Sequence, residues 1–515
     1  MSFDVKRVRA AYPALNDGFA YLDGAAGTQV PATVIDAITD AYRAGLGNVG
    51  GAFPASGRSG SIVAECRQAL ADLTGASPDG VILGPNMTTL TYRLAEALSR
   101  RWERGDEIVV SRLDHDANVR PWVQAAARRG ATVRWAEVDL ATTELPAGQY
   151  SELLSERTRL VAVTAASNVV GTRPDLAAIA AAAHAVGALV YVDGVHATPH
   201  VPVDVAALGA DFYATSAYKW SGPHIGTVVA DPALLDSLHP DKLAPAPAEV
   251  PGRFERGTAA FADLAGVVAA VEHLASLGHG PDLVVATRRQ RVLASMATVE
   301  DYETQLFAGL LGGLDAMEHV TLYGRAARRA PTAFFTVAGR TPRKVAEPAL
   351  LETVTPDKLL PSSDTVPERF ELGTLPYELL AGTTAAVDFI ADLVPGTGGR
   401  RARVVASMAA VEEHEDRLFD RLAAGLRTLD RVTLHGSPAR HTPTVLFSVE
   451  GVPSRDVYEK LGAAGVNAPA GSFYALEASR WMGLGDTGAV RAGLAPYTDS
   501  GDVERLLAGV AQLCG

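Results

Sequence analysis

The feature that most constrains this chain is a regular alternation of short apolar runs with alanine-rich stretches between residues 20 and 230. The apolar runs are rich in β-branched residues, which predicts buried strands, and the stretches between them, such as residues 174–185, have a helical composition. The six runs begin at Gly80, Glu107, Thr132, Leu160, Leu189 and Gly226. Strands that alternate with helices predict an α/β domain whose mostly parallel sheet is covered on both faces. Because ligands bind beyond the C-terminal ends of such strands, the polar residues that follow them are the candidates for function.

Composition narrows the class of protein. The chain has 515 residues, enough for two or three domains, and is 48% hydrophobic and 20% charged, as in a globular protein with a large core. A net charge of −13 without a basic stripe argues against nucleic acid as a partner. We find neither a signal-peptide pattern nor an apolar run of membrane-spanning length, so we expect a cytoplasmic protein with no membrane partner. The two cysteines, Cys66 and Cys514, are isolated and make neither a disulfide framework nor a zinc site.

The second half of the chain contains a tandem duplication. Residues 288–339 and 400–451 are identical at 27 of 52 aligned positions, with an offset of 112. Upstream, the motif RFERGT (residues 253–258) recurs as RFELGT (residues 369–374), with an offset of 116. The sequence of each copy predicts a Gly-Thr loop, a helix, a long helix and two strands. Two copies of such mixed elements do not make a solenoid. Removing one 116-residue unit leaves 399 residues, the size of one large and one small domain, so we expect one copy to be redundant.

This organisation predicts five segments. An N-terminal segment (residues 1–20) precedes a large α/β domain (residues 21–229). The first copy (residues 230–345) and the second copy (residues 346–452) follow. The remainder (residues 453–515), with a strand near residue 490 and a closing helix, completes a small α+β domain.

The strongest chemical signal is Lys219, within the motif YATSAYKWSGPHIG (residues 213–226). A lysine among Ser, Tyr, Trp and Gly, directly after a strand, can form an imine with an aldehyde cofactor when desolvation keeps part of it neutral. The alternative is a surface lysine in a glycine-rich turn.

Asp193 ends the apolar strand LVYVD, and His196 follows three residues later. A buried aspartate can keep a pyridine nitrogen protonated, which makes the ring an electron sink. His196 could hydrogen-bond a phenolic oxygen of such a ring. The alternative for Asp193 is a helix cap.

Weaker signals lie elsewhere. Thr88 and Thr89 open a predicted helix, where backbone N–H groups and hydroxyls suit a phosphate, although an ordinary helix cap has the same pattern. His115 and Asn168 are weak signals by themselves, because a lone histidine is more often packed or hydrogen-bonded than functional. Arg491, on a strand near the C-terminus, could bind a carboxylate through two hydrogen bonds, or could form a surface ion pair.

Taken in order, these elements resemble the class V aminotransferase superfamily of fold-type I pyridoxal-phosphate enzymes, and most closely its cysteine desulfurase-like proteins. The resemblance extends from YLDGAAG (residues 21–27) to the end of the chain, interrupted by the extra repeat. It implies a large domain with a mostly parallel seven-stranded sheet and a small α+β C-terminal domain. It also implies an amino-acid substrate, pyridoxal 5'-phosphate as cofactor, and a homodimer.

The resemblance assigns a role to each residue around the cofactor ring. Lys219 would carry the Schiff base, and Asp193 would pair with the pyridine nitrogen. His115 would stack on the ring, while His196 and Asn168 would approach the ring oxygen.

The remaining roles concern the phosphate and the substrate. Thr88, Thr89 and Ser216 would bind the phosphate, together with a Gly-Thr loop from the partner subunit. Arg491 would bind the α-carboxylate of the substrate.

The chain departs from the family pattern in three places. Cysteine desulfurases carry a nucleophilic cysteine in a mobile loop before the C-terminal strand, but the matching loop here, PAGSFYALE (residues 469–477), contains none. Tyr218 precedes the lysine where desulfurases commonly have histidine. The duplication supplies two Gly-Thr loops, ending at Thr258 and Thr374, of which the second is closer to the family pattern and the first is joined directly to the large domain.

We therefore expect a pyridoxal-phosphate enzyme in which Lys219 also moves the α-proton of an amino acid. A cysteine desulfurase-like or C–S lyase reaction leads on resemblance. An aminotransferase or epimerase is the second hypothesis, supported by the missing loop cysteine, and a catalytically inactive scaffold is the third. The polar loop at residues 48–58 is a further candidate for substrate contact.

Overall fold

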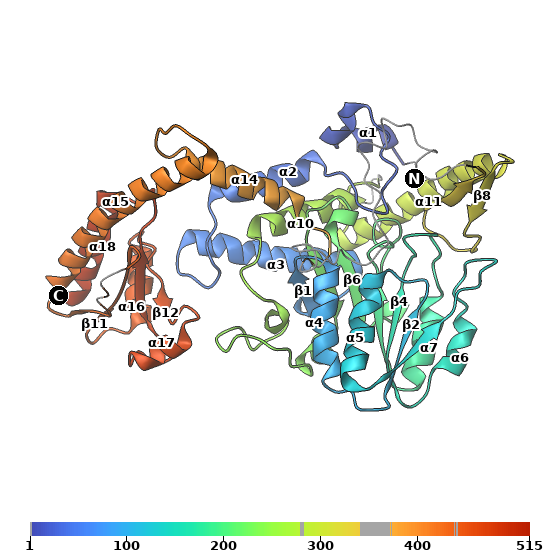
Figure 1. Ribbon diagram of the computed structural model, residues 1–515, viewed down its shortest axis with the longest axis horizontal. Helices are drawn as coiled ribbons and strands as arrows, with labels where there is room; N and C mark the ends of the chain where they lie inside the picture. Colours follow the sequence, from blue (N-terminus) through green and yellow to red (C-terminus); the bar gives the residue numbers. More distant parts are fainter. Residues whose placement is uncertain (1–2, 279–282, 340–370, 372, 437, 439–440) are drawn as a thin grey trace. The chain divides into compact units, whose positions relative to one another are not determined.

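The computed structural model describes residues 3–278, 283–339, 371, 373–436, 438 and 441–515 (Figure 1). The chain forms two compact units. The first contains Met1–Arg43, Ile62–Lys242 and Pro247–Pro376, and the second contains Ala44–Ser61, Leu243–Ala246 and Tyr377–Gly515. Among the described residues, no helix combines the length and apolar character that crossing a bilayer requires.

The first unit is built on a seven-stranded sheet with the order β1-β7-β6-β5-β4-β2-β3. Its strands are β1 (Val81–Gly84), β2 (Glu107–Ser111), β3 (Thr132–Ala136), β4 (Thr158–Thr164), β5 (Leu189–Asp193), β6 (Phe212–Ser216) and β7 (Gly226–Ala230). Strands β2 to β6 run parallel, and β7 is antiparallel to both of its neighbours, β6 and β1. The predicted α/β fold with a mostly parallel sheet is confirmed.

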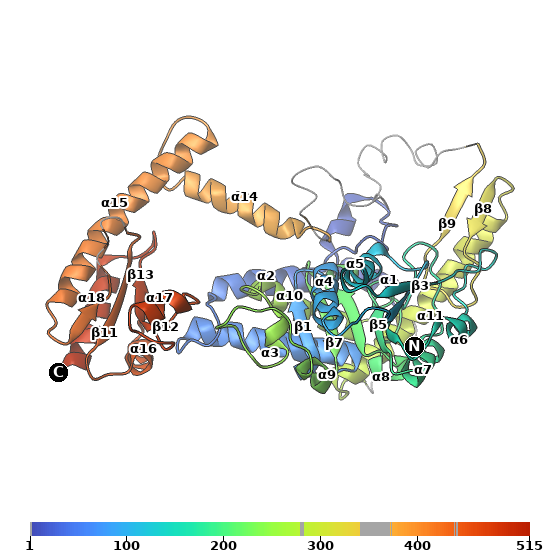
Figure 2. The ribbon, with the colours of Figure 1, turned by 60° about the horizontal axis from the view of Figure 1, so that its bottom comes forward.

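Helices cover both faces of this sheet (Figures 1 and 2). The helices in this part of the chain are α1 (Val5–Ala10), α2 (Ala32–Ala44), α3 (Pro54–Thr74), α4 (Met87–Ser99), α5 (Arg120–Arg129), α6 (Tyr150–Leu153), α7 (Leu176–Ala185), α8 (Val205–Leu208), α9 (Pro232–Asp236), α10 (Phe261–Ala275) and α11 (Arg288–Asp315). Successive strand residues point to opposite faces, so Val190 and Val192 enter one core cluster with α3, α7 and α10. Tyr191, between them, enters the other cluster with α4 and α5.

The second unit contains a four-stranded antiparallel sheet with the order β10-β11-β13-β12. Its strands are β10 (Val432–Leu434), β11 (Thr444–Val449), β12 (Ala470–Gly471) and β13 (Ala489–Gly493). Its helices are α14 (Tyr377–Ala391), α15 (Arg400–Arg427), α16 (Ser454–Ala463), α17 (Leu476–Trp481) and α18 (Ser500–Cys514). The core joins α15, α16 and α18 to the sheet around Leu422, Phe447 and Val490.

The two copies fold alike. In the first, α10 and α11 form a helical hairpin followed by the strands β8 (Val320–Tyr323) and β9 (Phe334–Val337). In the second, α14, α15, β10 and β11 repeat this order. The same buried serine joins each hairpin: Ser295 donates to Ala275 O (3.0 Å), and Ser407 donates to Ala391 O (3.2 Å).

The copies differ in which half of the long helix is buried. Helix α11 buries its N-terminal half, including Val292 and Met296, whereas α15 buries Leu418, Leu422 and Leu426 in its C-terminal half. The first unit contains the described residues of the first copy except Leu243–Ala246, and the second unit contains the described second copy from residue 377 onwards.

Two sequence expectations need comment. Residues 48–58 are not a loop throughout, because α3 begins at Pro54 and its first turns take up residues 54–58. Residues 369, 370 and 372 of the motif RFELGT, and the expected boundary at residues 345/346, lie outside the described residues.

Candidate active site

Lys219 lies in a tight turn directly after the parallel part of the sheet. Strand β6 ends at Ser216, and the short helix η5 (Ala217–Lys219) follows it. The Nζ atom of Lys219 donates hydrogen bonds to the carbonyl oxygens of Ala25 (2.6 Å) and Ala26 (2.7 Å). The N-terminal segment is held against the turn, since the N–H of Thr28 donates to Tyr218 O (3.0 Å). The motif at residues 21–27 therefore lies beside the lysine, although the two are almost 200 residues apart.

Asp193 ends β5, the strand next to β6. Its side chain is 5% exposed, and its Oδ1 accepts a hydrogen bond from the N–H of Val195 (3.0 Å). Burial raises the pKa of Asp193, while that hydrogen bond and electrostatic interactions with His115 and Lys219 act in the opposite direction. A bound cationic group would therefore stabilise this carboxylate in its charged form.

His196 is 5% exposed. Its Nε2 lies 2.7 Å from the hydroxyl of Thr332, and its Nδ1 is buried without a hydrogen-bond partner in the described part of the chain. Burial, together with the charges of His200 and Lys219, lowers the pKa of His196 to about 3, so the ring is neutral at neutral pH. A neutral imidazole in this state can make one more hydrogen bond to a ligand.

His115 and Asn168 follow β2 and β4, at the same edge of the sheet. The ring of His115 is exposed, and its Nδ1 accepts a hydrogen bond from the N–H of Ala117 (3.1 Å). Asn168 is half-buried in a turn that the N–H of Gly171 closes by donating to Ser167 O (2.9 Å).

The first turn of α4 gathers the residues predicted to bind phosphate. Thr88 and Thr89 lie in this turn, whose N-cap, Asn86, accepts a hydrogen bond from the N–H of Thr89 (2.8 Å). Ser216, at the end of β6, accepts from the N–H of Met87 (3.1 Å). A helix N-terminus attracts anions, so this turn is suited to a phosphate group.

The two Gly-Thr loops have different surroundings. A Cβ atom on Gly373 would lie 2.6 Å from Oδ1 of Asn86, and the hydroxyls of Thr374 and Tyr218 are 3.1 Å apart. By contrast, Thr258 is exposed, and a Cβ on Gly257 would meet no heavy atom within 4 Å.

Arg491 belongs to the second unit. Its guanidinium stands 3.8 Å from the ring centroid of Phe473, in the loop before β13, and its side chain is exposed. Both residues line a cavity of 620 Å³ between α15, the β10–β11 hairpin and that loop.

Neither cysteine stands in this loop. Cys66 is fully buried in α3, where burial raises the pKa of its thiol to about 12. Cys514 is the last residue of α18. A thiol needs a low pKa and access to solvent in order to act as a nucleophile, so Cys66 is unsuited to that role.

The residues of the first unit fit pyridoxal phosphate. A buried carboxylate (Asp193), a buried ring nitrogen with no partner among the described residues (Nδ1 of His196) and a helix N-terminus with hydroxyl side chains lie at one edge of the sheet. These are the donors and acceptors that a protonated pyridine, a ring oxygen and a phosphate require. Lys219 lies at the same edge of the sheet, in the turn after β6.

Sequence reasoning missed several contacts of these residues. Thr332, 136 positions from His196, was not a candidate, since no local pattern marks it. Asp114 lies beside His115 and accepts from the Nδ2 of Asn118 (2.7 Å); burial raises its pKa to about 8. The histidine motif LDHDAN (residues 113–118) could have drawn attention to Asp114.

The fold and these residues define the class of protein, and comparison with known families agrees. The sequence model of the class V aminotransferases ("Aminotransferase class-V") matches residues 20–349 and 350–506. This chain therefore belongs to the class V aminotransferase family of pyridoxal-phosphate-dependent enzymes. The match divides near residue 350, close to the expected junction of the two copies.

Individual relatives support the same assignment. The uncharacterized protein MT3887 of Mycobacterium tuberculosis (strain CDC 1551 / Oshkosh) is 40% identical over 356 residues, which cover 68% of this chain and 88% of that protein. The aminotransferase-like protein FGM3 of Gibberella zeae is 32% identical over 364 residues, 67% of this chain and 85% of its own. A cysteine desulfurase of Yersinia pseudotuberculosis is 33% identical over 356 residues, 65% and 83% of the two chains.

Solved structures confirm the fold. The cysteine desulfurase CsdA from Escherichia coli matches with a TM-score of 0.55 and 22% identity, over 99% of this chain and 98% of that chain. A cysteine desulfurase from Thermococcus onnurineus NA1 matches with a TM-score of 0.53 and 20% identity, over 100% and 98%. The predicted fold-type I architecture is thus confirmed.

Proposed function

We propose that this chain acts on a sulfur-containing amino acid and cleaves its C–S bond without a persulfide relay on a cysteine of its own. The enzyme class rests on one observation: Lys219, Asp193 and the start of α4 converge at one edge of the sheet. The C–S reaction rests on the relatives that are cysteine desulfurases. The exclusion of the relay rests on the cysteine-free loop at residues 469–477 and on the buried Cys66.

Lys219 would hold the cofactor and move the substrate's α-proton. When bound, pyridoxal phosphate supplies an aldehyde for the lysine and an electron sink for the substrate. Once the Nζ atom of Lys219 is released from the cofactor, it would take the α-proton of the substrate. The carbonyl oxygens of Ala25 and Ala26 would orient this Nζ atom.

The other residues would bind and orient. Asp193 would keep a proton on the pyridine nitrogen, because a buried carboxylate is most stable beside a cation. His196, neutral and paired with Thr332, would contribute its remaining ring nitrogen to the ring oxygen, with Asn168 nearby. His115 would cover the face of the ring and exclude water.

Thr88, Thr89 and Ser216 would bind the phosphate at the start of α4, and Arg491 would bind the α-carboxylate. We further propose a homodimer, as the family resemblance implies.

Trapping of the cofactor tests the enzyme class. The purified chain should be yellow, and borohydride should leave a reduced cofactor adduct on the peptide that contains Lys219. The Lys219→Ala variant is the control and should yield no adduct. A colourless wild-type protein without the adduct would favour an inactive scaffold instead.

Product analysis tests the reaction. With cysteine or cystine, we expect sulfur release together with pyruvate. Formation of alanine with a persulfide on the protein would contradict the absence of a relay. Keto-acid formation that depends on an amino acceptor would indicate an aminotransferase instead of a C–S lyase, and a racemised substrate would indicate an epimerase. These two activities are the second candidate function, which the cysteine-free loop also favours.

A further inference from the structure

The loop at Gly373 and Thr374 is fitted closely to the first turn of α4. Gly373 has a φ of +77°, a left-handed conformation that favours glycine. A Cβ atom at this position would lie 2.6 to 2.8 Å from the side-chain amide of Asn86. Both the backbone and the neighbouring amide of Asn86 therefore favour glycine at this position.

Thr374 reaches the turn that carries the lysine. Its hydroxyl lies 3.1 Å from the hydroxyl of Tyr218, the residue directly before Lys219. Tyr218 in turn stacks on His224, with ring centroids 4.7 Å apart. The loop thus touches both sides of the predicted phosphate site, α4 through Asn86 and the lysine turn through Tyr218.

The corresponding loop of the first copy makes different contacts. Glu255, three residues before Thr258, accepts from the N–H of Leu83 (2.8 Å) and pairs with Arg67 (2.9 Å). Helix α10 begins at Phe261, three residues after Thr258. Because three residues span about 10 Å at most, Thr258 stays close to these two anchors, and its side chain points into solvent.

We propose that Gly373-Thr374 of the second copy completes the phosphate site of its own chain, rather than that of a partner subunit. The inference rests on the proposed function, and it departs from the partner-supplied loop that the family resemblance implies. In this arrangement the extra copy brings a second Gly-Thr loop back to the large domain of the same chain. Thr374 then adds a hydroxyl to those of Thr88, Thr89 and Ser216.

A disulfide test needs no cofactor. In a Cys514→Ser background, Asn86→Cys and Gly373→Cys introduce two thiols at positions whose side chains would touch, because a Cβ atom on Gly373 would lie 2.7 Å from Cγ of Asn86. Oxidation should give a covalent link within one chain, seen as a faster-migrating monomer on a non-reducing gel.

A covalent dimer, or folded protein that does not cross-link, would overturn the proposal. Asn86→Cys with Gly257→Cys is the matched pair for the first copy. An intrachain link from that pair in place of the first would overturn the proposal as well. Either result leaves the cofactor assignment intact, because the readout does not involve it.

Hybrid dimers provide a second measurement, should the cysteine variants fail to fold. A Lys219→Ala chain is combined with a Thr374→Val chain, so that the only remaining Lys219 faces a valine in its own loop. We expect this hybrid to bind pyridoxal phosphate about tenfold more weakly than the wild type, by absorbance titration, as the Thr374→Val homodimer does, because one hydrogen bond to a charged group is lost. Recovery of the wild-type dissociation constant would show that the loop comes from the partner and would overturn the proposal.

Discussion

The long helices of the two copies carry the same leucines at their C-terminal ends, yet only one copy buries them. Leu418 and Leu422 of α15 are 9% and 0% exposed, whereas the equivalent Leu306 and Leu310 of α11 are 62% and 51% exposed. Glycine shows the same contrast. A Cβ on Gly425 would lie 2.5 Å from Leu507 of α18, while a Cβ on the equivalent Gly313 would meet nothing within 4 Å.

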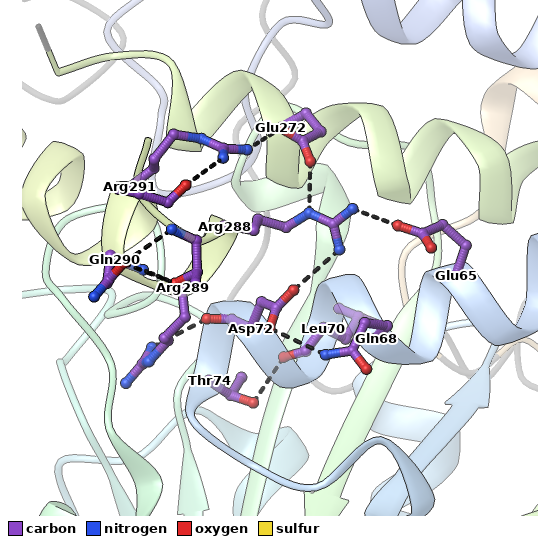
Figure 3. Close-up of polar contacts among 12 residues, drawn as sticks. Glu65, Gln68, Leu70, Asp72, Thr74, Glu272, Arg288, Arg289, Gln290 and Arg291 are labelled. Atoms are coloured by element: carbon purple, nitrogen blue, oxygen red, sulfur yellow. Dashed lines mark hydrogen bonds and ion pairs between the residues drawn. The ribbon is translucent and has the colours of Figure 1, made fainter. Parts of the chain in front are cut away.

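At the N-terminal ends the contrast is reversed. Met296 of α11 is 1% exposed, and its equivalent in α15, Met408, is 48% exposed. Arg288 of α11 pairs with Glu65 and Asp72 of α3 as well as Glu272 of α10 (Figure 3).

The equivalent of Arg288 in α15, Arg400, pairs with Asp388 of α14, the residue that corresponds to Glu272. Each copy thus keeps the contact within its own helical hairpin. Only the first copy has an arginine at this position that also reaches α3.

The difference in burial between α11 and α15 shows that the shared sequence pattern gives a long helix two apolar surfaces, one in each half. Each surface is buried only where its partner element is present: the large sheet and α3 for the first copy, and the tail with α16 and α18 for the second. Burial in this region is therefore set by neighbours in space rather than by the helix itself.

The largest effect should come from the leucine pair. Leu422→Ala leaves a cavity in the core of the second unit and should lower its free energy of unfolding by about 2–5 kcal/mol. Leu310→Ala, at the exposed equivalent position, should change the free energy of unfolding by no more than about 0.5 kcal/mol. Urea titrations of both variants measure the two values. Equal losses would mean that the first copy also buries this face.

The arginine pair should give a smaller difference. Arg288 is 17% exposed and bonded to three carboxylates, so Arg288→Ala should cost about 1–3 kcal/mol. Arg400→Ala breaks an exposed pair and should cost at most about 0.5 kcal/mol. A large loss from Arg400→Ala would contradict the contrast.

The pH dependence of Arg288→Ala sharpens that test. Burial raises the pKa of Glu272, but Arg288 and Arg291 outweigh it and leave the pKa below its usual value of 4.5. A carboxyl with a lowered pKa contributes stability above its unfolded pKa, and this contribution is lost as the pH falls through the folded pKa. The stability difference between wild type and Arg288→Ala should therefore be full above about pH 4.5 and shrink below it. Denaturant midpoints from pH 7 to pH 3 would show this, and a difference that grows in acid would contradict it.

The serine pair should behave alike. Ser295→Ala and Ser407→Ala each remove a buried hydroxyl that donates to the preceding helix and accepts from the N–H of Gly278 (2.8 Å) or Val394 (3.4 Å). Each should cost about 1 kcal/mol. Hydrogen exchange at those two amides would report the loss locally. A difference of more than about 1 kcal/mol between the copies would show that their helical hairpins are not equivalent.

The smallest expected effect on stability comes from deleting one repeat. Removing residues 301–412 joins Glu300 to Glu413 in register and keeps only the buried half of each long helix. Thr444 would then occupy the position of Thr332. The shortened chain should fold cooperatively, with a thermal midpoint within a few degrees of that of the full chain. Aggregation would show that the exposed halves stabilise the molecule. Because the deletion removes Thr374, cofactor affinity is not the measure here.

Much of the fold could be predicted from the sequence because its causes are local. The alternation of apolar runs and alanine-rich stretches placed six of the seven strands of the large sheet, and the motif around Lys219 placed the lysine after a strand, which is β6. Asp193 was recognisable at the end of an apolar run, and β5 does end there. Their roles remain proposals that the trapping experiment tests.

Contacts between distant segments could not be predicted in this way. The pairing of His196 with Thr332, and the position of Lys219 against Ala25 and Ala26, join residues more than 130 positions apart. Helix α3 begins at Pro54, within the segment predicted to be a loop, because small and polar residues in the first turns of a helix have the composition of a loop.

The alternation of strands and helices by itself determined the α/β class, and the internal identity of residues 288–339 and 400–451 by itself determined that the small-domain segment is duplicated. The tertiary structure decided which half of each copy is buried and which Gly-Thr loop lies at α4. The physical reason is that the two copies have nearly the same propensities and apolar patterns. Only the neighbours that each copy meets in space differ, and these neighbours come from parts of the chain that lie outside both repeats.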